Sequence, residues 1–202
     1  MTDRNLQIFG AVSHKYKSEK IPRTELEMFE SKYKIKLPSE FKDFLLHIGS
    51  GAGPDYGIFT LSQMKKEYEE WVDCLDENSR LSNQCDLKNN DAIELIQKKQ
   101  NAPKEFHYRR LKNANGILPI HTEGCTYYCY IILNGEQHGK IWSADSNEFD
   151  TLPAGMIVEF GFLDWYENWV DQCISKLGTP IRETAENGAE KKYKLWWKRI
   201  FS

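Results

Sequence analysis

The feature that most constrains this chain is an apolar run that ends in a turn signal. Residues 125–133, CTYYCYIIL, are rich in aromatic and β-branched side chains, which favour an extended strand. Asn134-Gly135 follows directly and is typical of turns between antiparallel strands. Residues 138–145, HGKIWSAD, predict the return strand, and residues 116–120, GILPI, predict a strand before the pair. These segments together indicate a compact antiparallel sheet.

Helical patterns lie on both sides of these strands. Residues 23–33, RTELEMFESKY, and residues 37–49, LPSEFKDFLLHIG, carry apolar side chains at helical spacing, and Thr24 is expected to cap the first helix. Residues 161–177, GFLDWYENWVDQCISKL, predict a closing helix. This order predicts an α+β fold, in which a largely antiparallel central sheet is packed with helices from both ends of the domain.

The connections between these elements are less regular. A glycine-rich loop, residues 49–57, leads into a short strand predicted over Gly57–Leu61, and Ser62 is expected to cap a further helix. Glu148–Leu152 is the candidate for a fourth strand, and the chain is then expected to turn through Pro153 and Gly155.

Two segments fall outside this regular pattern. We expect residues 1–178 to form a single domain with a polar, locally basic surface insertion at about 78–115. Residues 179–202 form a polar linker and a basic aromatic tail, KKYKLWWKRIF. We expect this tail to pack on the domain or to contact a partner rather than to lie on a membrane.

Composition excludes several classes of protein. The net charge of −3 gives no reason to expect a nucleic-acid partner. Five cysteines without regular spacing favour reduced thiols and a cytoplasmic location over a disulfide framework. The longest apolar run, residues 127–133, is too short to span a bilayer, so no integral membrane association is expected.

The histidines and cysteines near the turn raise the question of a metal site. If residues 125–133 are extended, Cys125 and Cys129 lie on one strand face about 13 Å apart, and His121 lies further still from Cys129. Zinc needs each sulfur at ~2.3 Å. We therefore expect no metal site and no cofactor. A catalytic thiol would need a histidine brought close by the fold, and a buried or turn-flanking role is the simpler interpretation.

Carboxylates offer a third kind of chemistry. Residues 143–175 contain no lysine or arginine but hold several acidic residues, so three interpretations stay open. A solvated helix face ranks first, a negative patch that complements a basic protein ranks second, and acid–base catalysis ranks third.

The ordered motifs resemble those of the SUKH superfamily, the Smi/Knr type. LPSEFKDFLLHIGSGAGPDYGIFTL is similar to its early signature, GILPIHTEGCTYYCYIILNGEQHGKIW to its central hairpin, and FGFLDWYENWVD to its closing helix. The resemblance covers about residues 22–177. The residues that carry it are Leu37, Pro38, Phe44, Leu45, Gly57, Asn134, Gly135, Gly139, Ile141, Trp142 and Trp165.

The resemblance implies an α+β fold without enzymatic activity, and many bacterial members of the family are immunity proteins that neutralise a cognate toxin. We therefore expect a binding protein that covers the active surface of a toxin. The alternatives are a regulatory scaffold of the same fold and a hydrolase that uses the acidic segment 145–171. The residues expected to bind the partner are Asp55, Tyr56, Asp145, Glu148, Asp150, Asp164 and Glu167.

Overall fold

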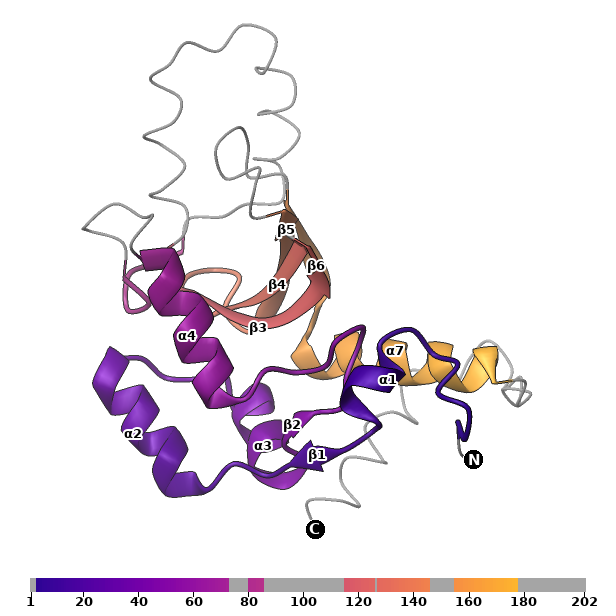
Figure 1. The fold of residues 1–202 in the computed structure, drawn as a ribbon. Coiled ribbons are helices and arrows are strands. Elements are labelled where there is room, and N and C mark those ends of the chain that lie inside the picture. The colour runs from indigo at the N-terminus through magenta and orange to yellow at the C-terminus, as the bar shows by residue number, and fades with distance from the viewer. Residues whose placement is uncertain (1–2, 73–79, 86–114, 126, 146–154, 178–202) are drawn as a thin grey trace, which may run out of the picture.

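The structure, a computed structural model, describes residues 3–72, 80–85, 115–125, 127–145 and 155–177 (Figure 1). Within these residues the predicted α+β fold is confirmed. The helices are α1 (Ala11–His14), α2 (Arg23–Tyr33), α3 (Ser39–His47), α4 (Leu61–Val72) and α7 (Phe162–Lys176). The strands are β1 (Ser18–Glu19), β2 (Ser50–Gly51), β3 (Ile117–Gly124), β4 (Tyr127–Ile132), β5 (Lys140–Asp145) and β6 (Gly155–Gly161).

The larger sheet is antiparallel throughout, in the order β3-β4-β5-β6. β3 and β4 form a tight hairpin, in which Gly124 is the register partner of Tyr127. The Asn134-Gly135 turn signal lies, as predicted, between β4 and β5. The amide of Gly139 closes this connection by donating to the Ile132 carbonyl at 2.8 Å. The smaller sheet pairs β1 with β2, which ties the N-terminal part of the chain to the glycine-rich loop.

The closing helix and the first two long helices share one core. α7 follows β6 directly and contacts both β6 and α3, while α4 lies against β3 (Figure 1). Phe41 and Phe44 of α3 meet Phe162 of α7 with ring centroids 4.7 and 4.9 Å apart. The predicted motif residues Leu37, Phe44, Leu45, Ile141 and Trp142 are all buried. Many of the residues that carry the family resemblance are therefore core residues.

Several local predictions are wrong. α2 begins at Arg23 without a side-chain cap, because Pro22 stands at the cap position, so Thr24 is already helical. Gly57–Leu61 is not a strand. Ile58 alone forms single bridges, to Gly51 and His121.

α4 also begins earlier than predicted, at Leu61. Its cap is Thr60 rather than Ser62. The Thr60 hydroxyl accepts the Gln63 amide at 3.2 Å, and the Gln63 side chain accepts the Thr60 amide at 2.9 Å. This reciprocal pair is a capping box.

The fourth strand of the sheet lies later than predicted. β6 begins at Gly155, where the sequence indicated a turn. The candidate strand Glu148–Leu152 lies outside the described residues.

The start of the segment predicted as an insertion packs against the core. Leu81 is buried in the main core. The Asn134 amide group donates to the carbonyls of Leu81 and Asn83 at 2.9 and 3.2 Å. Residues 86–114 and the tail 179–202 lie outside the described residues. No helix in the described part of the chain is long and apolar enough to cross a bilayer.

Two tyrosine phenols and one cysteine thiol predict that the protein loses stability at alkaline pH. Burial raises the pKa of Tyr128 to about 12 from its ordinary 10.0, and burial likewise raises the pKa values of the Tyr166 phenol and the Cys129 thiol. These groups ionise first in the unfolded chain, so the stability they contribute is complete below pH 9.0 and is lost as pH rises towards about 12. Urea unfolding from pH 7 to pH 11 should show a falling free energy above about pH 9, with a shallower fall in Tyr166→Phe. A flat profile would contradict this assignment.

Candidate functional site

A buried histidine holds the loop that was predicted to bind a partner. His121 on β3 is 1% exposed, and its Nδ1 lies 3.1 Å from the Gly57 carbonyl oxygen. Its Nε2 lies 3.2 Å from Asp55 Oδ2. Each ring nitrogen therefore faces an oxygen. These two contacts tie His121 to Asp55 and Gly57 in the turn formed by residues 54–57, which we call the Asp55 loop.

Two glycines allow neighbouring segments to approach this loop closely. Gly10 has a φ of +79°, and a side chain there would meet the Asp55 carbonyl oxygen at 1.3 Å. Gly124 has a φ of +105°, and a side chain there would meet the Tyr56 ring at 2.9 Å. The N-terminal segment, residues 3–16, and the β3–β4 hairpin therefore press against the loop from two sides.

The N-terminal segment is itself locked in place. The Asp3 carboxylate accepts hydrogen bonds from the amides of Gln7 and Ile8 and, at 2.7 Å, from the Tyr16 hydroxyl. Ile8 and Ala11 then pack against Cys173 in a second, smaller core. This anchoring places Phe9 beside the Asp55 loop.

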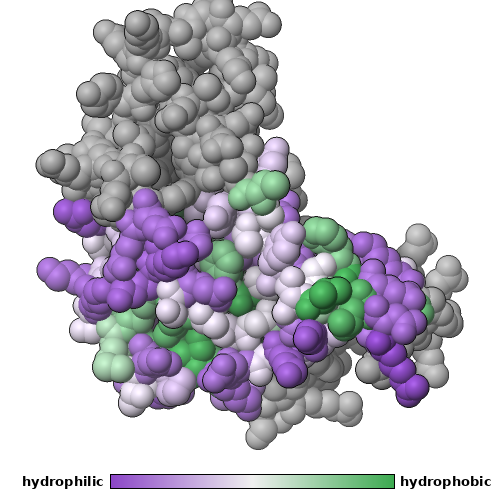
Figure 2. Space-filling view, viewed as in Figure 1, coloured by the Kyte–Doolittle hydropathy of each residue, from purple (hydrophilic) through white to green (hydrophobic). Residues whose placement is uncertain are grey.

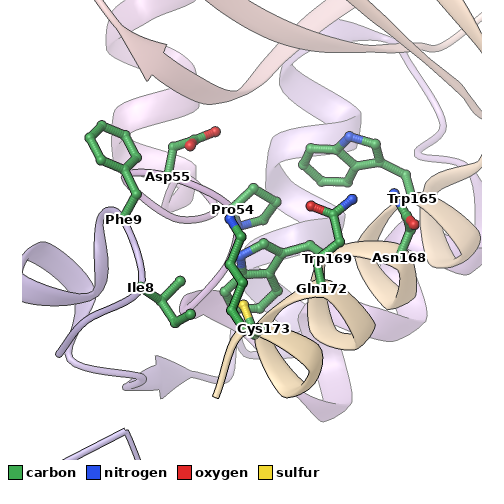
Figure 3. Close-up of a pocket in the computed structure, with 10 residues that line it drawn as sticks. Ile8, Phe9, Pro54, Asp55, Trp165, Asn168, Trp169, Gln172 and Cys173 are labelled. Carbon is green, nitrogen blue, oxygen red and sulfur yellow. The ribbon is translucent and has the colours of Figure 1, made fainter. Parts of the chain in front are cut away.

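A cleft of about 210 Å³ separates the loop and the N-terminal segment from α7 (Figure 3). Ile8 and Phe9 line it from the N-terminal segment, and Pro54 and Asp55 line it from the loop. The residues of α7 that line it are Trp165, Asn168, Trp169, Gln172, Cys173 and Lys176. The cleft is thus an aromatic hollow with one carboxylate at its edge.

Exposed rings stand next to this cleft. Phe9 is 61% exposed and Tyr56 is 47% exposed, and the two rings meet edge to face at 5.8 Å. Val12, one turn further along, is 66% exposed. In Figure 2 a hydrophobic area, in green, lies over the region of α1. Exposed aromatic side chains held rigidly are typical of protein-binding surfaces.

The sequence matches a known family. Residues 20–156 match the model of the SMI1 / KNR4 family (SUKH-1), which is well over half of the 202 residues. The chain belongs to the SMI1/KNR4 family (SUKH-1). No curated protein and no solved structure matches the chain.

In this SUKH-1 chain the cleft straddles the limits of the family match. Pro54 and Asp55 lie within the matched residues 20–156, whereas the N-terminal segment precedes them and α7 follows them. The loop at one edge of the cleft therefore belongs to the family's shared part, and the remaining walls are added by flanking segments.

The structure brings only some of the predicted binding residues together. Asp55 lines the cleft and Tyr56 stands beside it. Asp164 is exposed and Glu167 is half-buried on α7, but neither lines the cleft. Asp145 ends β5, and Glu148 and Asp150 lie outside the described residues. The acidic edge proposed after Trp142 therefore stays a prediction.

Sequence reasoning missed the contribution of the N-terminal segment to this SUKH-1 site. α1 has only four residues, and Phe9 precedes it without any periodic pattern. Trp169 lies within the predicted closing helix, residues 161–177, and no sequence feature indicated that it also lines the cleft. The one local signal is Gly10, because glycine marks positions where another backbone approaches closely.

The geometry assumed for the cysteines was partly wrong. Cys125 lies in the β3–β4 turn with a φ of +50°, not on the strand, and the reversal places His121 opposite Cys129 in the register. However, both nitrogens of His121 already face oxygens of the Asp55 loop, and the Cys129 thiol donates to Glu123 at 3.5 Å. Within the described residues, no three His, Cys, Asp or Glu side chains lie grouped as metal ligands.

The environment of Cys129 disfavours a nucleophilic thiol. Burial and the nearby Glu123 carboxylate raise the pKa of the thiol, whereas a reactive cysteine needs a lowered pKa and access to solvent. Iodoacetamide at about pH 8 should therefore modify the exposed Cys125 long before Cys129 in the folded protein. Peptide mass spectrometry measures this, and denaturant should make the two sites react alike. Rapid modification of Cys129 in the folded protein would contradict this description.

Proposed function

We propose that this chain is a non-enzymatic binding protein of the immunity type, which binds a cognate toxin and neutralises it by covering the toxin's active surface. Membership of the SMI1/KNR4 family supports this function. The structural observation that carries the proposal is the Asp55 loop, which His121 holds in one conformation while Tyr56 and Phe9 stay exposed.

A rigid surface of this kind suits steric inhibition. Aromatic side chains that are ordered before binding lose little conformational entropy when a partner covers them. Tyrosine is enriched both at interfaces and among the residues that dominate binding energy. The Asp55 carboxylate adds a polar contact at the same place, so the loop offers one charged and one aromatic anchor.

Co-expression with a toxin encoded beside this gene tests the proposal. Cells should survive the toxin only when this chain is present, and the two proteins should co-purify. Tyr56→Ala should weaken the complex about tenfold or more if Tyr56 is a hot spot. Met28→Ala is the matched control, since Met28 is 64% exposed on α2, away from the loop (Figure 1).

The outcomes separate the alternatives. If no neighbouring toxin binds or is neutralised, the immunity function is wrong. Binding to another protein without toxin neutralisation would instead support a regulatory scaffold. Turnover of a substrate that disappears on neutralising Asp145, Glu148 and Asp150 would support a hydrolase.

A further inference from the structure

The walls of the cleft are suited to a flat side chain. Phe9 projects from the N-terminal segment on one side, and the indoles of Trp165 and Trp169 project from α7 on the other (Figure 3). Aromatic faces attract cations, and the planar guanidinium group of arginine both stacks on rings and pairs with carboxylates. The volume of the cleft, about 210 Å³, also suits a single side chain, because it is below the roughly 300–1,000 Å³ of small-molecule pockets.

Three carboxylates lie at or near the rim of the cleft. Helix geometry places Asp164 and Asp171 on the same side of α7 as Asn168, which lines the cleft, because they lie four residues before it and three after it. Asp55 adds a third carboxylate, and Lys176 is the opposing charge on the lining. Asp55 is paired with His121. Asp164 and Asp171 do not themselves line the cleft, but they lie about one helical turn from Asn168, within the roughly 8 Å over which charges attract a cation at physiological salt.

We propose that this cleft is the specificity pocket for an arginine side chain of the protein partner. The guanidinium group lies between the ring of Phe9 and the indoles of α7, and it reaches the Asp55 carboxylate at the edge of the cleft. Within the described residues, Asp55 Oδ1 makes no hydrogen bond, and the Asp55 side chain is 31% exposed, so it has room to accept one. This inference rests on the proposed function, because it assumes a protein partner.

The position of the pocket explains why it would confer specificity. Most of its lining comes from segments that flank the family match at residues 20–156. Trp165 of α7 is among the residues that carry the family resemblance, whereas Ile8 and Phe9 precede residues 22–177, which the resemblance covers. A partner arginine would thus meet the Asp55 loop beside an N-terminal wall that lies outside the family motifs.

A peptide titration of the isolated full chain tests the pocket directly. The probe is acetyl-Gly-Arg-Gly-amide, and the readout is the NMR signals of the Trp165 and Trp169 indole N–H groups. We expect saturable shifts with this peptide and none with its citrulline counterpart, which has the same shape but no charge. Equal shifts with citrulline, preferential binding of acetyl-Gly-Phe-Gly-amide, or no saturable shift with the arginine peptide would each overturn the proposal.

Matched variants test the same site without disturbing the core. Phe9→Ala should weaken arginine-peptide binding about fivefold or more, whereas Met28→Ala, which removes an equally exposed apolar side chain, should not. The double variant Asp164→Asn/Asp171→Asn should weaken binding and reduce its dependence on salt. Glu27→Gln on the exposed face of α2 is the charge control. Unchanged binding in both cleft variants would overturn the proposal.

The two proposals fail in different ways. Neutralisation of a toxin by a chain that does not bind the arginine peptide would overturn the pocket and leave the proposed function standing. Binding of the peptide without any toxin being bound or neutralised would support the pocket and overturn the immunity function.

Discussion

Replacing Phe44 with alanine should lower the free energy of unfolding by about 3–5 kcal/mol, a large fraction of the roughly 5–15 kcal/mol that stabilises a typical domain. Phe44 is completely buried, and its ring lies 4.9 Å from Phe162 and 4.6 Å from Tyr166. The substitution therefore removes two of the ring contacts that join α3 to α7, while Phe41 keeps its contact with Phe162. Urea unfolding followed by circular dichroism measures the loss.

Met28→Ala is the control for this experiment. Met28 is 64% exposed on α2, so its removal should change stability by only about 0.5 kcal/mol or less. A loss below about 1 kcal/mol for Phe44→Ala would show that α7 is not part of the cooperative core. That result would also undermine the cleft, because α7 supplies one of its walls.

Replacing His121 with phenylalanine should lower the free energy of unfolding by about 2–3 kcal/mol and loosen the Asp55 loop. Phenylalanine keeps an aromatic ring at this buried position but cannot donate to the Gly57 carbonyl or to Asp55. Amide hydrogen exchange at Gly57, whose N–H donates to Pro54 within the loop, should accelerate. Amides in the α2 helix should exchange faster only by the amount that the loss of global stability accounts for.

A second variant separates the His121–Asp55 contact from simple packing. If the orphaned carboxylate causes part of the loss, His121→Phe should cost less when Asp55 is already alanine, with a coupling of about 0.5–3 kcal/mol. Strict additivity of the two substitutions would mean that the His121–Asp55 contact contributes no stability. Loss of toxin binding in His121→Phe with the core intact would connect the loop conformation to function.

Much of the fold could be predicted because it depends on local patterns. The stripe of Phe41, Phe44 and Leu45 predicted α3, and the same residues form the core in the structure. The position of β6 could not be predicted in the same way. Its first residue, Gly155, reads locally as a turn residue, and only pairing with β5 makes it part of a strand.

The candidate site was less predictable than the fold. Asp55 and Tyr56 were expected from the loop and its family resemblance, and they lie at the cleft. The separation of His121 from Cys129 was misjudged, because the hairpin reverses at Cys125 rather than at a position with an obvious turn signal. Phe9 was missed because its place depends on Asp3, Gly10 and Cys173, which are distant from the loop in the sequence.

The periodic spacing of apolar residues, together with Asn134-Gly135, was enough to establish the α+β class and the antiparallel hairpins, since side-chain periodicity and turn chemistry act within a few residues. The cleft required the folded chain. It forms where the N-terminal segment, the Asp55 loop and α7 meet, and the lining residues are separated by up to about 170 residues of sequence. Long-range packing alone decides which side chains share such a surface, because no local pattern records which segments will become neighbours.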